Sequence, residues 1–233
     1  MISPQELASK IDLTLLKPNA RREDIRKVCE NAVKYGFYAV CVNPCHVKFV
    51  SELLKDTGVK VCTVIGFPLG ANTVETKVFE ARQAVENGAD EIDVVANIGA
   101  IKDGDFKYVE NEIRKIVAEV KKLKPNTIVK VIIETAYLTD EEKVKVCKAL
   151  IKAGADFVKT STGFAERGAT IEDVKLLKEA GEGKLKVKAA GGIRTLEFAV
   201  KLLKAGADRL GASRGVEIVE EATKESSSNS DMQ

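Results

Sequence analysis

Short apolar segments alternate with amphipathic segments along almost the whole chain. Segments with helical periodicity, such as 74–86 and 141–153, separate the apolar ones. Short apolar runs between polar loops are typical of buried parallel strands. The pattern therefore predicts a strand followed by a helix, repeated eight times. The predicted strands are 10–16, 38–42, 60–65, 91–96, 128–134, 157–161, 185–190 and 209–213.

The tripeptide Gly-Ala-Asp recurs where a helix is expected to end and a strand to begin. It occupies 88–90, 154–156 and 206–208, and 35–43 is a degenerate copy. Glycine directly after a periodic apolar segment indicates a helix C-terminus, because the left-handed conformation costs glycine little. We therefore predict an α/β fold, a single (β/α)8 TIM barrel with a short N-terminal helix, over residues 1–220. An open doubly wound sheet is the alternative, but no G-x-G-x-x-G follows the first strand.

Composition narrows the possible partners and location. The 233 residues are 45% hydrophobic and 31% charged, and 37 basic and 35 acidic residues leave a net charge of +2. No basic face stands out, so we expect neither nucleic acid nor a membrane as a partner. The N-terminus does not resemble a targeting segment, and we expect a soluble cytoplasmic protein. The serine-rich segment 221–233 predicts a disordered C-terminal tail.

The five cysteines are scattered and odd in number, which favours free thiols in a reducing compartment. The segment CVNPCH at 41–46 holds two of them and the only histidine. Its spacing is not that of a familiar zinc site, and no second ligand cluster follows. We predict no metal, with Cys41 packed inside and Cys45 on a loop.

Lys159 is the first candidate for chemistry. It lies near the end of an apolar strand, in DFVKTSTGF, where burying an ammonium group is costly. In a TIM barrel the active site forms at this end of the strands, and Lys188 lies on the next strand. The two ammonium groups should therefore be close together. A neighbouring cation and desolvation lower the pKa of a lysine, whose free amine can then form a Schiff base with a carbonyl compound.

Two carboxylates are expected at the same end of the barrel. Asp93 can share a proton with Lys188 or a bound water, which would complete a set of nucleophile, acid and base. Plainer interpretations stay open, because Lys188 could be a solvated strand end and Asp93 could bond a loop backbone. Asp12 is expected to be structural and to orient a neighbouring lysine.

Glycine-rich loops after the last three strands predict a phosphate site. TIM barrels often bind phosphate with the loops after strands seven and eight. Glycine lets backbone N–H groups approach an anion, and a serine hydroxyl can donate to it. Arg194 and Arg214 could add charge, although Arg194 could equally lie on a helix surface. The predicted phosphate ligands are Gly163, Gly191, Gly192, Gly211 and Ser213.

The segments IDLTLLKP, VIGFPLG, EIDVVANIGA, DFVKTSTGF and VKAAGGIRT resemble motifs of the deoxyribose-phosphate aldolase family. The resemblance covers about residues 8 to 218. It implies a class I aldolase, without metal or cofactor, that cleaves 2-deoxy-D-ribose 5-phosphate reversibly to acetaldehyde and D-glyceraldehyde 3-phosphate. The partners would be these small molecules, and we expect a homo-oligomer, either a dimer or a tetramer.

The resemblance also implies roles for individual residues. Lys159 would form the Schiff base, Lys188 would lower its pKa, and Asp93 with Lys188 would transfer protons. Asp12 and Thr162 would belong to a supporting polar network, and the glycine loops would hold the phosphate.

The chain departs from the family pattern at Leu13, where many relatives have histidine and others leucine, and at two further places. Phe164 stands where some relatives have a phosphate-binding lysine, and no tyrosine follows Tyr137, whereas some relatives end in a tyrosine that assists proton transfer. Three alternatives stay open: a Schiff-base aldolase for a keto acid or ketose bisphosphate, an isomerase that uses carboxylates, and a barrel that only binds sugar phosphates.

Overall fold

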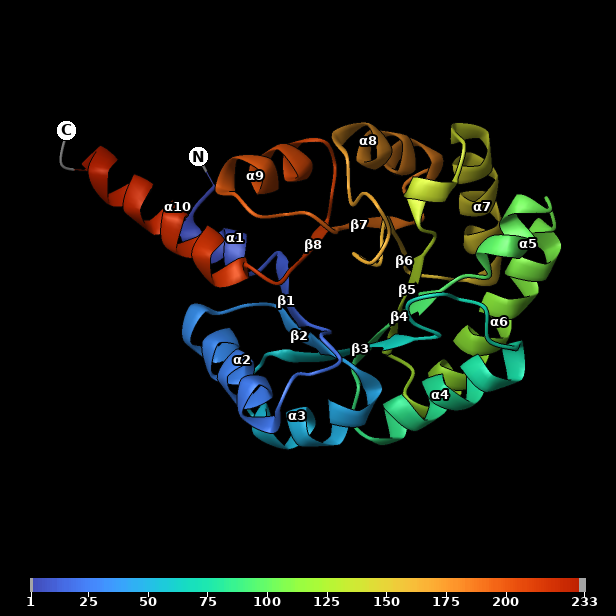
Figure 1. Cartoon of the computed structure of the whole chain (residues 1–233), viewed down its shortest axis with the longest axis horizontal. Coiled ribbons are helices and arrows are strands. Elements are labelled where there is room, and N and C mark those ends of the chain that lie inside the picture. The colour runs from blue at the N-terminus through green and yellow to red at the C-terminus, as the bar shows by residue number, and fades with distance from the viewer. Residues whose placement is uncertain (1, 231–233) are drawn as a thin grey trace.

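Eight parallel strands close into a barrel in the computed structural model, which describes residues 2–230 (Figure 1). Each strand pairs with the next in sequence, and the last pairs with the first. The predicted (β/α)8 barrel is therefore confirmed, and all eight predicted strands are present. Their bounds are β1 (Ile11–Leu15), β2 (Ala39–Val42), β3 (Lys60–Ile65), β4 (Glu91–Val95), β5 (Ile128–Ile132), β6 (Phe157–Lys159), β7 (Lys186–Ala190) and β8 (Arg209–Ala212).

Helices surround the barrel, and the short predicted N-terminal helix is present as α1 (Pro4–Ala8). Outward-facing strand residues pack against these helices and form the main apolar core. The other helices are α2 (Arg22–Tyr35), η1 (Pro44–His46), α3 (Val47–Leu53), α4 (Val74–Glu86), α5 (Ile98–Lys102), α6 (Phe106–Leu123), η2 (Thr135–Tyr137), α7 (Asp140–Ala153), α8 (Ile171–Ala180), α9 (Leu196–Lys204) and α10 (Gly215–Ser230).

The Gly-Ala-Asp repeats have a common structural role. The glycine takes a positive φ at the end of a helix, as at Gly154 with φ 81°. The aspartate then accepts a hydrogen bond from a backbone N–H of the preceding strand of the barrel. Asp90 accepts from Val61 N at 2.9 Å and Asp156 from Val129 N at 2.8 Å. Asp208 makes the same bond to β7, so each repeat satisfies a backbone donor near the start of a strand.

The prediction of a disordered tail is wrong for residues 221–230, because α10 continues across residue 220 to Ser230. Ile218, Val219 and Ala222 are buried, and Glu221 accepts a hydrogen bond from Leu196 N at 3.0 Å. The serine hydroxyls donate to carbonyls one turn earlier, as from Ser227 to Thr223, instead of interrupting the helix. Residues 231–233 lie outside the described residues.

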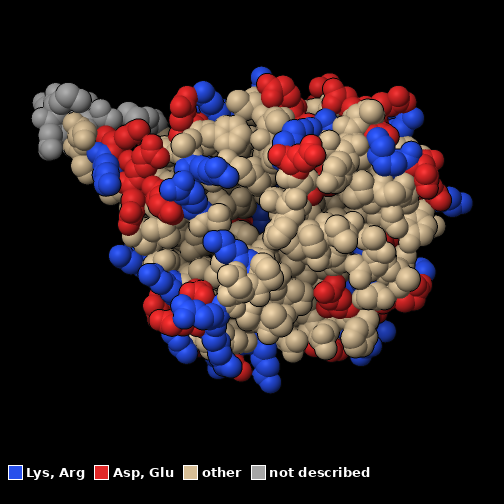
Figure 2. All heavy atoms as spheres, in the orientation of Figure 1, with Lys and Arg blue, Asp and Glu red and all other residues tan. Residues whose placement is uncertain are grey.

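Basic and acidic side chains lie next to one another over the helices on the face shown in Figure 2. This mixture agrees with the near balance of charge in the sequence. No helix among residues 2–230 combines the length and the apolar character needed to cross a bilayer.

A buried ion pair fixes the loop that follows β4. Lys77 on α4 donates to Glu112 on α6 at 2.7 Å and to the carbonyl of Val95 at 2.8 Å. Glu112 also accepts from Asn97 N at 3.1 Å, and both charged side chains have no exposed surface. The pair thus holds the carboxyl end of β4, the strand that carries Asp93.

We expect Lys77→Met to lower the free energy of unfolding by about 3–5 kcal/mol, because Glu112 would be left buried without its cation. Adding Glu112→Gln should recover part of this loss, since a neutral amide oxygen can still accept from Asn97. Lys201→Met removes an exposed helical ion pair and serves as the control, with an expected loss of less than about 0.5 kcal/mol. Urea unfolding measures all three, and equal losses for Lys77→Met and Lys201→Met would contradict the role of the buried pair.

Candidate active site

The inside of the barrel holds a dense group of charged side chains. Three carboxylates and four cations lie there, each at most 7% exposed. They contact one another through hydrogen bonds and ion pairs, and they leave an excess of one positive charge. The carboxylates are Asp12, Glu91 and Asp93, and the cations are Lys130, Lys159, Lys188 and Arg209.

Asp93 lies at the centre of this charged group. Its Oδ2 accepts from the amines of both Lys159, at 2.7 Å, and Lys188, at 2.8 Å. Its Oδ1 accepts from Lys130 at 2.9 Å. The predicted closeness of Lys159 and Lys188 is therefore confirmed, since the two amines share one oxygen atom.

The register of the strands brings these groups together. Lys159 on β6 is aligned with Lys188 on β7, and Asp93 on β4 is aligned with Lys130 on β5. Alternate residues of a strand point to opposite faces, so the residues between them, such as Val158 and Val187, enter the apolar core outside the barrel. The charged side chains consequently face one another in the interior.

Asp12 contacts the amine of a neighbouring lysine, Lys188, which it is expected to orient. Its Oδ2 accepts from the Lys188 amine, and its Oδ1 accepts from Arg209 at 2.9 Å. Burial alone would raise the pKa of Asp12, but the charges of Lys188, Lys130 and Arg209 outweigh it and lower the pKa to about 2.

The same balance of burial and charge sets the ionisation of Asp93 and Lys188. Burial would raise the pKa of Asp93, yet the surrounding lysines hold it well below its ordinary value. Burial would lower the pKa of Lys188, yet Asp12 and Asp93 raise it. In the resting site, the carboxylate is therefore ionised and Lys188 is protonated.

Three members of the charged group were missed by the sequence analysis, namely Lys130, Glu91 and Arg209. Lys130 stands within the apolar run IVKVIIE, the same signal that identified Lys159. It lies in the middle of its strand, whereas the active site of a TIM barrel is expected at the strand ends. Glu91 and Arg209 open their strands and carry no such signal, since a charged residue at the start of a strand is ordinarily solvated. Here Arg209 pairs with the carboxylates of Asp12 and Glu91. Its guanidinium carbon also lies 3.3 Å from the centroid of the Tyr38 ring.

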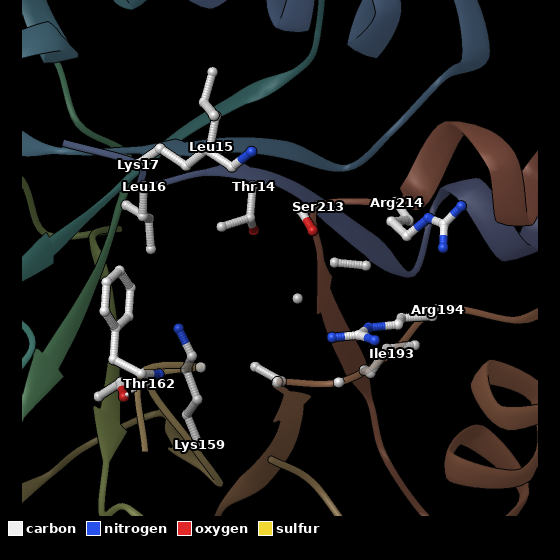
Figure 3. A pocket seen from close by; sticks show the side chains of 17 residues that line it. Thr14, Leu15, Leu16, Lys17, Lys159, Thr162, Ile193, Arg194, Ser213 and Arg214 are labelled. Carbon is white, nitrogen blue, oxygen red and sulfur yellow. Dashed lines mark hydrogen bonds between the residues drawn. The ribbon is translucent and has the colours of Figure 1, made fainter. Parts of the chain in front are cut away.

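A pocket lies at the carboxyl ends of the strands, directly over Lys159 (Figure 3). The amine of Lys159 points into it. Asp93 and Lys188 are not part of the pocket lining and lie deeper in the barrel. All five predicted phosphate ligands line the pocket: Gly163, Gly191, Gly192, Gly211 and Ser213.

The two arginines at the pocket differ in direction. Arg194 points its guanidinium into the pocket, whereas Arg214 points away and pairs with Glu217 at 3.4 Å (Figure 3). Gly191 allows the loops after β6 and β7 to touch, because a Cβ there would lie 2.9 Å from the Cα of Gly168. Its φ of 88° also excludes most other residues.

Thr162 also lines the pocket, but its polar partner is not a lysine. It donates from its backbone N–H and its hydroxyl to the buried carboxylate of Glu134, a residue that the sequence analysis did not select. Thr162 thus belongs to a second polar cluster, beside the one around Asp93.

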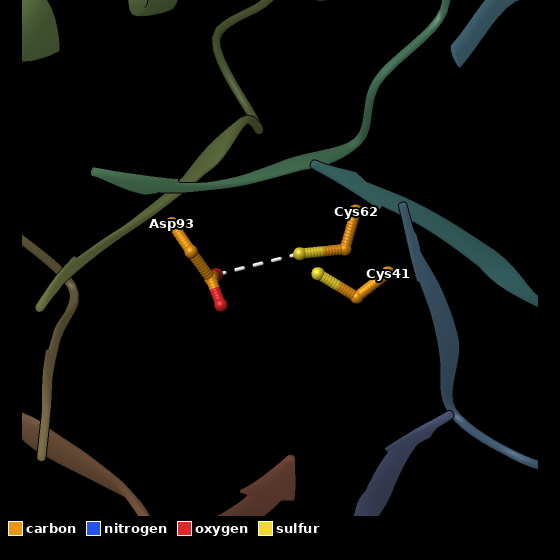
Figure 4. A group of neighbouring side chains, drawn as sticks. All are labelled: Cys41, Cys62 and Asp93. Atoms are coloured by element: carbon orange, nitrogen blue, oxygen red, sulfur yellow. Dashed lines mark hydrogen bonds between the residues drawn. The ribbon is translucent and has the colours of Figure 1, made fainter. Parts of the chain in front are cut away.

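Cys41 and Cys62 lie in register on β2 and β3, and Cys62 donates to Asp93 at 3.3 Å (Figure 4). Cys41 is buried, as predicted, whereas Cys45 is exposed and lies in the short helix η1 and not on a loop. The ligand atoms of Cys41, Cys62 and Asp93 lie within 4.8 Å of one another. Both oxygens of Asp93 already accept from lysines, however, and these ammonium groups would repel a metal cation.

The model of the DeoC/LacD aldolase family matches residues 7–221. The chain belongs to this family. Among its relatives, the deoxyribose-phosphate aldolase of Caldanaerobacter subterraneus is 57% identical over 223 residues, which cover 96% of each chain. That of Thermococcus kodakarensis is 55% identical and covers 96% of this chain and 100% of its own. The solved structure of the tetrameric deoxyribose phosphate aldolase from Aeropyrum pernix has a TM-score of 0.88 and 39% identity, and the match covers 94% of this chain and 91% of that chain.

The low pKa of Asp12 predicts how stability depends on pH. The pKa of Asp12 falls from 3.8 to about 2 on folding. The ionised carboxylate therefore stabilises the folded protein when the pH lies above 3.8, the ordinary pKa of the group. This contribution, roughly 2–3 kcal/mol, is lost as the pH falls toward 2. The Asp12→Asn variant has no carboxyl group at this position that can take up a proton. The difference in unfolding free energy between wild type and variant should therefore become smaller as the pH is lowered from about 5 to about 3. Urea unfolding at each pH measures it, and a constant difference would contradict the pKa.

Proposed function

We propose that this protein is a class I aldolase that reversibly cleaves 2-deoxy-D-ribose 5-phosphate to acetaldehyde and D-glyceraldehyde 3-phosphate. One observation carries the proposal: the amine of Lys159 points into a pocket lined with glycine loops, while a buried carboxylate links it to a second ammonium group. The relatives with more than half of their residues identical are deoxyribose-phosphate aldolases, which supports this substrate.

Lys159 is the proposed nucleophile because it has the fewest carboxylate partners. Lys130 contacts three carboxylates within 4.0 Å, Lys188 and Arg209 contact two each, and Lys159 contacts one. The interior carries one excess positive charge, and loss of a proton removes that excess. The proton is lost at the smallest electrostatic cost from the cation with the least compensation.

The reaction then follows from amine chemistry. The neutral amine attacks C1 of the open-chain sugar, and loss of water from the carbinolamine leaves an iminium ion. A base removes the proton of the C3 hydroxyl, the C2–C3 bond breaks, and its electron pair moves into the iminium to give an enamine. Glyceraldehyde 3-phosphate departs, C2 takes up a proton, and water releases acetaldehyde and the free lysine.

We assign the proton transfers to Asp93 and Lys188. Asp93 is ionised and can accept, and Lys188 is protonated and can donate. They share an oxygen contact directly below the nucleophile, so a proton can move between them without leaving the barrel interior.

The phosphate of the substrate is proposed to bind at the glycine loops and Ser213. Arg194 supplies positive charge there, since its guanidinium points into the pocket. Phe164 packs edge-on against Phe67, with ring centroids 5.3 Å apart, and gives the pocket one apolar wall.

We further propose that the protein is a cytoplasmic homo-oligomer, a dimer or a tetramer. The relative from Aeropyrum pernix is tetrameric, and the large apolar side chains of Leu69 and Phe79 are 76% and 64% exposed here. The free thiols fit a reducing compartment.

Trapping with borohydride and acetaldehyde tests the proposal. We expect one ethyl group on Lys159, detected by intact mass and peptide mapping, because reduction fixes the iminium. Lys159→Ala should abolish both trapping and cleavage. Lys188→Met should retain the nucleophile but lower cleavage by about a hundredfold or more, since proton transfer is worth that much. Lys186→Met, an exposed lysine on the same strand as Lys188, is the matched control and should leave both unchanged.

Two results would contradict this function. Labelling by pyruvate but not by acetaldehyde would favour an aldolase for keto acids. An enzyme that stays unlabelled and active after borohydride treatment with substrate would point to isomerisation by carboxylates.

A further inference from the structure

Glu134 has an unusual backbone conformation for its residue type. It follows β5 and precedes η2, with φ 50° and ψ 72° in the left-handed region. A residue other than glycine is held there at a cost of about 1–3 kcal/mol, so the surrounding structure must enforce it. The residue is only 3% exposed, which places a carboxylate in the interior next to the pocket.

The contacts of this carboxylate go to one residue of the next loop. Both oxygens accept from Thr162 N, at 3.3 and 3.2 Å, and Oε2 also accepts from the Thr162 hydroxyl. Among the residues that the structure describes, no lysine or arginine lies within 4.0 Å of these oxygens. The Glu134 carboxylate therefore bonds to the loop after β6 and takes no part in the ion pairs around Asp93.

Thr162 connects the Glu134 carboxylate to the glycine loops. Its hydroxyl oxygen accepts from Phe164 N at 3.0 Å and closes a tight turn around Gly163, whose φ is 87°. Gly163 packs against Gly191 in the loop after β7, because a Cβ on Gly191 would lie 3.5 Å from the Cα of Gly163. The position of Thr162 thus determines how two loops of the proposed phosphate site fit together.

The nucleophile is held by separate contacts. The carbonyl of Lys159 accepts from Ile133 N at 3.1 Å, and Thr160 N donates to the carbonyl of Lys188 at 3.0 Å. The Lys159 amine is bound to Asp93. None of these bonds passes through the Glu134 carboxylate, so the amine and the phosphate loops can be disturbed independently.

We propose that Glu134 is a positioning residue that fixes the turn at Thr162–Phe164 and so shapes the phosphate end of the pocket. This inference rests on the proposed function, in which the glycine loops bind the substrate phosphate. Its left-handed backbone turns the side chain toward the loop after β6, and the strain is offset by the hydrogen bonds to Thr162.

Glu134→Ala and Glu134→Gln test the role in the full-length protein. We expect Glu134→Ala to raise KM for deoxyribose 5-phosphate and Kd for inorganic phosphate by about tenfold or more, the effect of losing hydrogen bonds to a charged group. The rate of borohydride trapping of acetaldehyde on Lys159 should change by less than about threefold, since its supporting bonds remain. Glu134→Gln should recover part of the affinity, because its amide oxygen can accept from Thr162 N.

Glu182→Ala is the matched control, because Glu182 also has a φ of 50° but is exposed. It should change neither affinity nor trapping. If Glu134→Ala does not fold, Thr162→Val removes the hydroxyl of the same contact and should raise the same KM and Kd.

Unchanged phosphate affinity in these variants, or an equal loss of trapping and affinity, would overturn the positioning role. If the proposed function itself is wrong, acetaldehyde and borohydride will not label Lys159 in the wild-type protein either. The Kd for inorganic phosphate still tests Glu134 in that case, since it does not require turnover.

Discussion

The carboxylate of Asp93, shared among three ammonium groups in the buried interior of the barrel, is the interaction on which the site depends. Removing charges from water costs several kcal/mol per ion and is compensated only when the lone pairs and protons find partners. Here the two oxygens of Asp93 bind Lys130, Lys159 and Lys188. Closure of the barrel is what makes this possible, because these residues come from four different strands.

This arrangement separates two tasks within one pocket. The strands place the amine and the proton-transfer pair in the rigid interior, where burial and neighbouring charges set their ionisation. The loops beyond the strands form the polar wall that is proposed to hold the phosphate. Glu134 stands at the boundary, anchored at the end of β5 but bonded to the loop after β6. Chemistry and substrate binding can therefore be altered by different residues.

Much of the barrel and the centre of the site could be predicted from the sequence, because each strand carries its own local signal. Lys159 and Asp93 were found because they interrupt apolar runs, and Lys188 because it lies on the strand next to Lys159. Glu91 and Arg209 could not be found this way, since their enclosure depends on closure of the barrel and on contacts across it. The helical course of residues 221–230 was missed because serine-rich composition suggests disorder, whereas the hydroxyls bond back to the helix.

The ionisation of Asp93 provides the most direct measurement. Carbon-13 NMR of its side-chain carboxyl carbon, assigned by comparison with Asp93→Asn, reports whether the group takes up a proton as the pH falls. If three ammonium groups share this carboxylate, its signal should stay at the ionised position throughout the range from about pH 7 down to pH 4. A signal that titrates with a midpoint near or above the ordinary value for aspartate would contradict the shared-carboxylate arrangement.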